Sequence, residues 1–195
     1  YLHWWRATGD PLARRIATQT AQFLMDDLRT DEGGFASSLD ADSEGRDGAC
    51  YVWTRRQLGE VLGPEEGAWV ADLCGVNQAG TFERGASVLQ LRSDPDDPQR
   101  WASARAALLG ARRNRAQPAR DDKVVTAWNG LAIAALAEAG ALLDEPEWTA
   151  AAVACADLLV GSHWDPATRL LARISLDGRV SPDAAGVLED YADLA

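Results

Sequence analysis

Two short acidic segments carry side chains of the types that acid–base chemistry uses. Each lies beside an apolar run that predicts a helix, so their carboxylates are expected at helix N-termini, where they can cap free N–H groups. If two such helix ends face one funnel, opposed carboxylates can also hydrolyse a glycosidic bond or abstract a proton next to a sugar carbonyl. The candidate catalytic residues are Asp121, Asp122, Lys123, Glu189 and Asp190.

Lys123 is the single lysine among 19 lysine and arginine residues. In an arginine-rich chain, a retained lysine suggests a buried ion pair or a ligand contact that needs a compact ammonium rather than a planar guanidinium. Chance retention is the alternative. If the residue is functional, Lys123→Arg is expected to change stability or ligand binding by more than the ~0.5 kcal/mol of an ordinary surface substitution.

Trp128 and Asn129 follow one turn later and have the side chains of a sugar site. An indole face can stack on the C–H face of a sugar, while an amide can bond its hydroxyl groups. The alternative is that Trp128 is a core residue, which is the commoner role of a tryptophan in a buried helix. The eight tryptophans of the chain outnumber its three phenylalanines and three tyrosines, which favours stacking slightly.

An acidic loop, DADSEGRDG (40–48), places carboxylates at alternate positions before a glycine, as in the first half of an EF-hand calcium loop. The match then fails, because Tyr51 stands where such a loop needs a bidentate glutamate. The loop is therefore predicted as a solvated acidic turn or a ligand-facing loop, and no metal site and no cofactor are predicted.

The charge, the apolar runs and the cysteines of the chain exclude several classes of binding partner and location. The formal net charge is 19 − 30 = −11, which argues against nucleic acid and against an anionic membrane surface as partners. No run approaches about 18 consecutive apolar residues, so no transmembrane helix is expected. The three cysteines are far apart and odd in number, which favours small core residues in a reducing compartment, here the cytoplasm.

Apolar spacing and helix-capping signals predict a mainly α-helical chain. Long loops with short extended pieces are expected at 30–50, 75–97 and 164–187. Helix pairs separated by such loops indicate α-hairpins that close into a toroid or stack as a solenoid. The predicted helices are 11–29, 54–63, 64–73, 98–116, 124–143, 146–162 and one beginning at 188.

The chain starts at Tyr1 rather than at Met, and its last residues, LEDYADLA, look like the beginning of a helix. We therefore expect it to be a piece of a longer protein.

Four blocks of the sequence, in this order, resemble one known family. The resemblance is to the thioredoxin domain-containing proteins that include spermatogenesis-associated protein 20 and its bacterial relatives. It implies an (α/α)6 toroid similar to N-acylglucosamine 2-epimerases and six-hairpin glycosidases. Residues 1–195 would form part of that one toroid domain, with an N-terminal thioredoxin-like domain and the later hairpins absent. The blocks are GGFASSLDADSEG (33–45), YVWT (51–54), DDKVVTAWNGLAIAAL (121–136) and LEDYADLA (188–195).

The family blocks also imply which residues touch substrate. Related epimerases use histidines as acid and base, and no histidine matches here, so no catalytic histidine is transferred. His163 is expected to be a cap at a helix C-terminus. The substrate-binding candidates are Asp40, Asp42, Glu44, Trp53, Trp128, Asn129 and Tyr191.

Together these observations predict a carbohydrate-processing or carbohydrate-binding domain with a sugar or another small molecule as ligand. Its activity would be that of a sugar epimerase or isomerase, or glycosidase-like, with Lys123 tuning the pKa values of the carboxylates. The alternative is a non-catalytic scaffold that docks the thioredoxin-like domain. A calcium-dependent structural domain is a third hypothesis.

Overall fold

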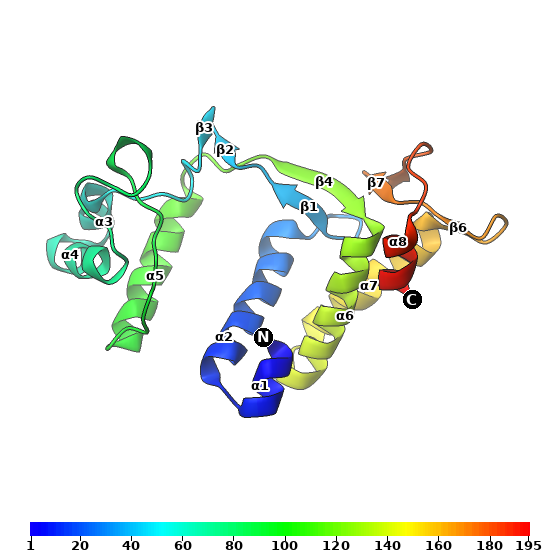
Figure 1. The fold of residues 1–195 in the computed structure, drawn as a ribbon, viewed down its shortest axis with the longest axis horizontal. Coiled ribbons are helices and arrows are strands. Elements are labelled where there is room, and N and C mark those ends of the chain that lie inside the picture. Colours follow the sequence, from blue (N-terminus) through cyan, green and yellow to red (C-terminus); the bar gives the residue numbers. More distant parts are fainter. The chain divides into compact units, whose positions relative to one another are not determined.

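The computed structural model describes all 195 residues and is mainly helical with small sheets (Figure 1). The chain divides into two compact units, which are described separately. Unit 1 combines Tyr1–Leu39 with Arg120–Ala195, and unit 2 is the intervening segment Asp40–Ala119.

Unit 1 contains five α-helices, and two of them continue into a π-helical turn. Asp10 accepts a hydrogen bond from the Leu12 N–H at 2.8 Å, and Pro11 occupies the first helical position, which fixes the start of α2. The predicted helices 11–29 and 146–162 are thus confirmed, with π-helical last turns. The elements are α1 (Leu2–Thr8), α2 (Pro11–Phe23), η1 (Leu24–Leu28), α6 (Thr126–Leu143), α7 (Pro146–Leu158), η3 (Leu159–His163) and α8 (Leu188–Leu194).

Helices α6 and α7 form a tight antiparallel hairpin. Asp144 takes a left-handed conformation (φ 59°) at the end of α6, as a short connection requires. A Cβ on Gly140 would lie 2.9 Å from the backbone N of Thr149, so the absence of a side chain lets the two helices approach closely. The core between these helices and α2 is built around Phe35, Leu136 and Trp148.

A four-stranded antiparallel sheet crosses unit 1 in the order β1-β4-β7-β8. In its register, Val124 lies opposite both Ala36 and Ser175. Extended pieces predicted in the loops 30–50 and 164–187 are therefore confirmed. The strands of unit 1 are β1 (Ala36–Leu39), β4 (Arg120–Val125), β7 (Ile174–Leu176), β8 (Arg179–Val180) and the separate pair β5 (Trp164–Asp165) and β6 (Leu170–Leu171).

The prediction that a helix begins at Val124 is wrong by two residues. Arg120–Val125 is strand β4, and α6 begins at Thr126. The β-branched valines pair with two neighbouring strands, which satisfies their backbone groups in a sheet. The acidic segment before them therefore lies along a strand and does not cap the helix that follows.

Unit 2 packs three helices around a small apolar core with Leu58, Val70 and Leu108 at its centre. Thr54 and Gln57 form the predicted capping box at the start of α3. In the predicted loop 75–97, only a short 3-10 turn and a single bridge between Ser87 and Trp53 form. The elements are β2 (Asp42–Ser43), β3 (Arg46–Asp47), α3 (Arg55–Leu62), α4 (Pro64–Leu73), η2 (Glu83–Gly85) and α5 (Pro98–Arg113).

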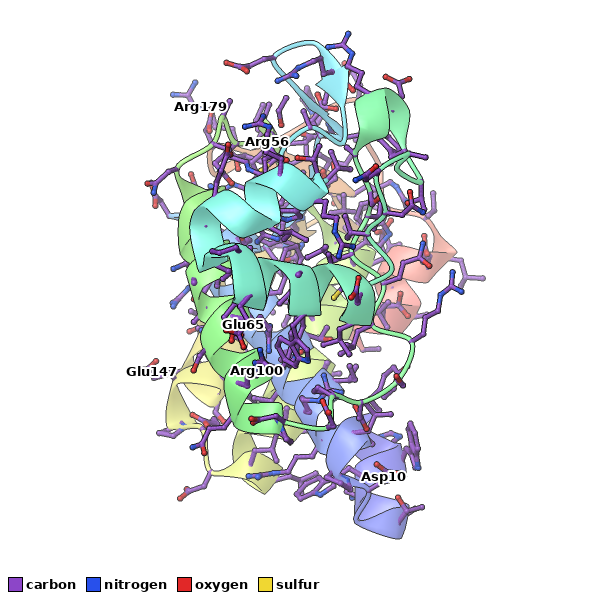
Figure 2. All side chains as sticks on the ribbon, turned by 90° about the vertical axis from the view of Figure 1, so that its left-hand side faces the viewer. Asp10, Arg56, Glu65, Arg100, Glu147 and Arg179 are labelled. Atoms are coloured by element: carbon purple, nitrogen blue, oxygen red, sulfur yellow. The ribbon has the colours of Figure 1, made fainter.

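An arginine on α5 holds α4 in place. Arg100 binds both carboxylate oxygens of Glu66, with its Nη2 at 2.7 Å, and its guanidinium lies 4.3 Å from the ring centroid of Trp69. The hydrogen bond from Arg100 lowers the pKa of Glu66, so this pair is ionised at neutral pH. Figure 2 shows Arg100 beside Glu65, the neighbouring acidic residue on α4.

Helix α6 is long and apolar enough to cross a membrane, with a mean hydropathy of 1.3 over its 18 residues. Core helices of soluble proteins pass the same test, and here α6 packs against α2, α7 and α8. The predicted helical hairpin is present in α6 and α7. The closure of such hairpins into a toroid, and one toroid spanning 1–195, stay predictions.

Candidate functional site at the N-terminal end of α6

The candidate polar residues of unit 1 lie on β4, on α6 into which β4 leads, and on α8, which packs on α6 (Figure 1). We call this region the α6 site; it comprises Asp121–Lys123 of β4, Thr126–Asn129 of α6, Arg173, and Glu189–Tyr191 of α8. Helix α8 lies directly on α6 here, because a Cβ on Gly130 would be only 2.2 Å from the carbonyl oxygen of Asp193. That glycine lets the segment carrying Glu189–Tyr191 reach the start of α6.

Asp190 is completely buried, and both oxygens of its carboxylate accept hydrogen bonds. Its carboxylate accepts hydrogen bonds from the Ala127 N–H at 3.0 Å, from the Val187 N–H at 2.8 Å and from Arg173 Nη1 at 2.9 Å. It therefore caps the N-terminus of α6 from another helix, in addition to the first turn of its own helix, where the sequence placed it. Such a carboxylate positions the site and does not face a ligand.

Glu189 and Tyr191 have different surroundings from the residue between them. The side chain of Glu189 is 53% exposed and accepts from Arg173 Nη2 at 3.3 Å. The hydroxyl oxygen of Tyr191 accepts from the Leu171 N–H at 2.9 Å and so anchors β6. Hydrogen bonds to the two carboxylates raise the pKa of Arg173. Glu189 is thus the accessible carboxylate of this segment.

Asp121 and Lys123 form an ion pair along β4, where residues two apart share a face. Their side chains are 41% and 44% exposed, so of the two functional roles weighed for Lys123 the buried ion pair is wrong, and the pair lies at the surface. Lys123 lowers the pKa of Asp121, which keeps this carboxylate ionised at neutral pH. Asp122 pairs separately with Arg120, which also donates to the carbonyl oxygen of Arg29 at 3.0 Å.

Trp128 and Asn129 point in opposite directions. Trp128 is 49% exposed, whereas Asn129 is 2% exposed. The Asn129 amide accepts from the Phe35 N–H at 2.7 Å and donates to the carbonyl oxygens of Phe35 and Val125. The amide is thus occupied by Phe35, just before β1, and by Val125 at the end of β4. Of the two predicted sugar-contacting residues only Trp128 is accessible.

A buried histidine lies beneath this site, and sequence reasoning missed it. His163 is 2% exposed, with Nδ1 2.7 Å from Thr126 Oγ1 and Nε2 2.8 Å from Ser175 Oγ. Thr126 donates its hydroxyl hydrogen to the Ala172 carbonyl oxygen, so Nδ1–H donates to Thr126 and the Ser175 hydroxyl donates to Nε2. Burial lowers the pKa of His163. The helix cap expected for His163 is wrong, because its ring instead links η3 to α6 and β7. No pattern in the sequence predicts these contacts.

The remaining candidates lie in unit 2. Asp40 accepts from the Asp42 N–H at 3.2 Å in an exposed turn, and Glu44 has a left-handed backbone (φ 54°) in the β2–β3 hairpin. Trp53 is 3% exposed, and the guanidinium of Arg115 lies 3.8 Å from its ring centroid. Trp53 is thus a core residue covered by an arginine. No group of three or more His, Cys, Asp or Glu side chains is arranged to hold a metal ion.

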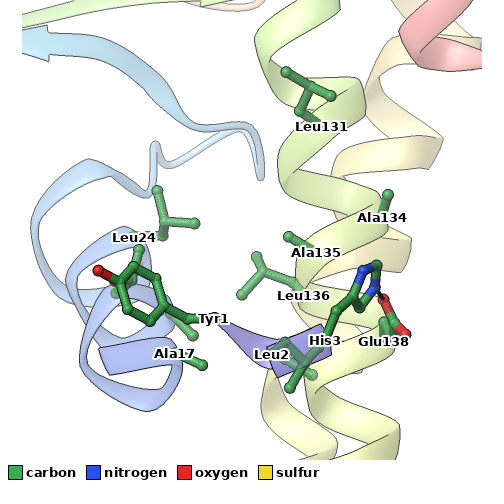
Figure 3. A pocket seen from close by; sticks show the side chains of 13 residues that line it. Tyr1, Leu2, His3, Ala17, Leu24, Leu131, Ala134, Ala135, Leu136 and Glu138 are labelled. Carbon is green, nitrogen blue, oxygen red and sulfur yellow. Dashed lines mark hydrogen bonds and ion pairs between the residues drawn. The ribbon is translucent and has the colours of Figure 1, made fainter. Parts of the chain in front are cut away.

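Unit 1 also contains an apolar cavity of about 470 Å³ between α1, α2 and α6 (Figure 3). Leu131, which is 57% exposed, lies on its α6 wall one turn beyond Trp128. His3 Nε2 and Glu138 Oε2 lie 2.8 Å apart at the cavity, and His3 and Arg6 lower the pKa of Glu138. The exposed face of α6 therefore runs from the α6 site into an apolar hollow.

The chain is similar to spermatogenesis-associated protein 20 of three mammals. Its identity is 28% to the protein of Homo sapiens and 27% to those of Rattus norvegicus and Mus musculus, over 98% of this chain. The chain spans 30% of the length of each relative. No family model matches it. The predicted resemblance is confirmed as a low-identity homology to these proteins.

Proposed function

We propose that unit 1 belongs to a carbohydrate-binding or carbohydrate-processing helical domain whose ligand lies on the α6 site. The observation that carries the proposal is the half-exposed indole of Trp128 in the first turn of α6, the helix that follows the strand carrying the ionised Asp121–Lys123 pair. A sugar offers C–H faces for such an indole, and hydroxyls that donate to a carboxylate and accept from an ammonium.

The state of the carboxylates limits the chemistry we propose. Asp121 is held ionised by Lys123, so it serves as a hydrogen-bond acceptor for hydroxyl groups and is poorly suited to act as a general acid. Asp190 is buried and engaged in capping. Proton transfer in an epimerase, isomerase or glycosidase-like reaction is therefore assigned to Glu189, the most exposed of the candidate carboxylates. A cytoplasmic location is part of the same proposal and is in keeping with three free, buried cysteines.

The test is a thermal melt of the protein across a panel of mono- and disaccharides. A ligand at about 100 times its Kd adds roughly 2.7 kcal/mol of stability, which raises the midpoint by several degrees. Trp128→Ala should abolish the shift. Trp4→Ala is the matched control, because Trp4 is 42% exposed but lies on α1 away from the α6 site. A sugar shift that survives Trp128→Ala would contradict the proposal.

A second candidate function is docking of a thioredoxin-like domain, and the apolar cavity of unit 1 favours it. Its wall includes Leu131 and Leu24, whose apolar surface would be buried by a partner. Leu131→Glu should then weaken association with a separately purified thioredoxin-like domain without abolishing the sugar-induced shift. Unchanged association would contradict docking at this face.

A further inference from the structure

Unit 2 contains a cavity of about 440 Å³ with a polar lining. The β2–β3 hairpin, the first turn of α3, the segment around η2 and the residues just after α5 enclose it. All of these segments lie within Asp40–Ala119, so the cavity belongs to unit 2 alone. No residue of the α6 site lines it.

Arg115 supplies a cation that is fixed in place at this cavity. Its Nη1 donates to the carbonyl oxygens of Cys50 at 2.9 Å and Val52 at 2.8 Å, and its guanidinium is stacked on Trp53. No carboxylate forms an ion pair with it, and its other nitrogens have no protein acceptor. A guanidinium held rigidly with unused donors is well prepared to bind oxyanions.

Three further donors at the cavity lack partners. Ser43 is 5% exposed, and its hydroxyl has no hydrogen-bond partner. Arg84 is exposed, has no carboxylate partner and holds a left-handed backbone conformation (φ 56°). The Gln57 side chain uses its oxygen to accept from Thr54, which leaves its NH2 group without an acceptor. A buried hydroxyl without a partner costs folding free energy unless a bound group satisfies it.

The acidic residues that line the cavity determine which further group the ligand must carry. Glu44 is balanced by Arg46, with an oxygen and a nitrogen 3.7 Å apart. Asp47 and Glu83 remain, and their acceptor oxygens match a donor group on the ligand. The lining carries three arginines and three carboxylates, so its formal charges balance, and the unpaired donors Arg84, Arg115 and Ser43 are the groups that an anion would bind.

We propose that this cavity binds a small anion through carboxylate or phosphate oxygens, with Arg115, Arg84 and Ser43 as donors. The ligand carries a hydroxyl or amino group of its own, which donates to Asp47 or Glu83. Because the chain has a net charge of −11, long-range electrostatics oppose an anion, and binding depends on these local donors.

Calorimetric titration of the protein with inorganic phosphate and with malate tests the proposal, with glycerol as a neutral control. Arg84→Gln should raise the Kd about tenfold or more, because a charge-assisted hydrogen bond is lost. Ser43→Ala should raise the Kd several-fold while leaving the unliganded melting midpoint unchanged or higher, since it removes an unsatisfied hydroxyl. Arg92→Gln is the matched control, because Arg92 is an exposed arginine of unit 2 that does not line the cavity.

Binding of phosphate alone would identify phosphate oxygens as the recognised group, and binding of malate alone would identify carboxylate oxygens. Binding of both supports recognition of anionic oxygens in general. The proposal is overturned if neither anion binds, if glycerol binds equally well, or if Arg84→Gln and Ser43→Ala both bind like the unmodified protein.

Discussion

The α6 site of unit 1 and the polar cavity of unit 2 use buried polar groups in opposite ways. In unit 1, Asp190, Asn129 and His163 are buried, and each is hydrogen-bonded to groups from other elements. In unit 2, the Ser43 hydroxyl is buried without a partner, and Arg84 and Arg115 bind no carboxylate. Satisfied groups fix a geometry, whereas unsatisfied groups lower stability until a ligand binds. Substitutions of these buried polar groups should therefore act on folding in the first region and on binding in the second.

The largest effect is expected for Asp190→Ala. It removes the cap of α6 and leaves the buried N–H of Ala127 and the N–H of Val187 without their acceptor, at a cost of about 2–4 kcal/mol. Urea unfolding measures this loss. Glu189→Ala is the control and should cost less than about 1 kcal/mol, because it breaks an exposed ion pair. Equal losses for the two variants would show that Asp190 is not a structural cap.

Two glycine-to-alanine substitutions, one inside each unit, compare how tightly the chain packs around each glycine. Gly130→Ala should cost about 1–3 kcal/mol, because its methyl group would meet the carbonyl oxygen of Asp193. Gly110→Ala on α5 should instead stabilise the chain by about 0.4–1 kcal/mol, since nothing lies within 4 Å of a Cβ there. Unfolding midpoints of the two variants, measured side by side, check both signs. A harmless Gly130→Ala would contradict the contact between α6 and α8.

The buried histidine predicts a pH dependence confined to unit 1. Burial lowers the pKa of His163 below its unfolded value near 6.5, so this group stabilises the fold above that value. The contribution is lost as pH falls towards the folded pKa, with a slope of at most about 1.4 kcal/mol per pH unit. His163→Gln should flatten the stability profile between about pH 7 and about pH 5. An unchanged slope in His163→Gln would contradict this assignment.

The smallest effect on folding is expected for Lys123→Arg. Its ion pair with Asp121 is half-exposed, so arginine can replace the charge with little change in the unfolding midpoint. Sugar affinity should fall, because the planar guanidinium presents its donors differently from an ammonium. Melts with and without sugar separate the two effects. A large loss of stability without sugar would contradict the assignment of this pair to the surface.

Local patterns in the sequence predicted the fold better than they predicted the site. Pro11 after Asp10 and the Thr54–Gln57 box marked helix starts that the structure confirms. The segment Asp121–Val125 was assigned to a helix mouth because the valines continue an apolar run, and only pairing with β1 and β7 makes it a strand. Asp190 and Asn129 have the right residue types for a sugar site, but their burial depends on contacts with residues 63 and 94 positions away. Sequence spacing does not encode such distant contacts.

The central claim is that carbohydrate contacts Trp128 on the α6 site. NMR of the indole N–H signals during titration with the sugar that shifts the melting midpoint tests it directly, with the Trp128 signal assigned from Trp128→Phe. We predict that the Trp128 signal moves, while the signal of Trp53, which is 3% exposed in unit 2, does not. A bound sugar that leaves the Trp128 signal in place would contradict the claim.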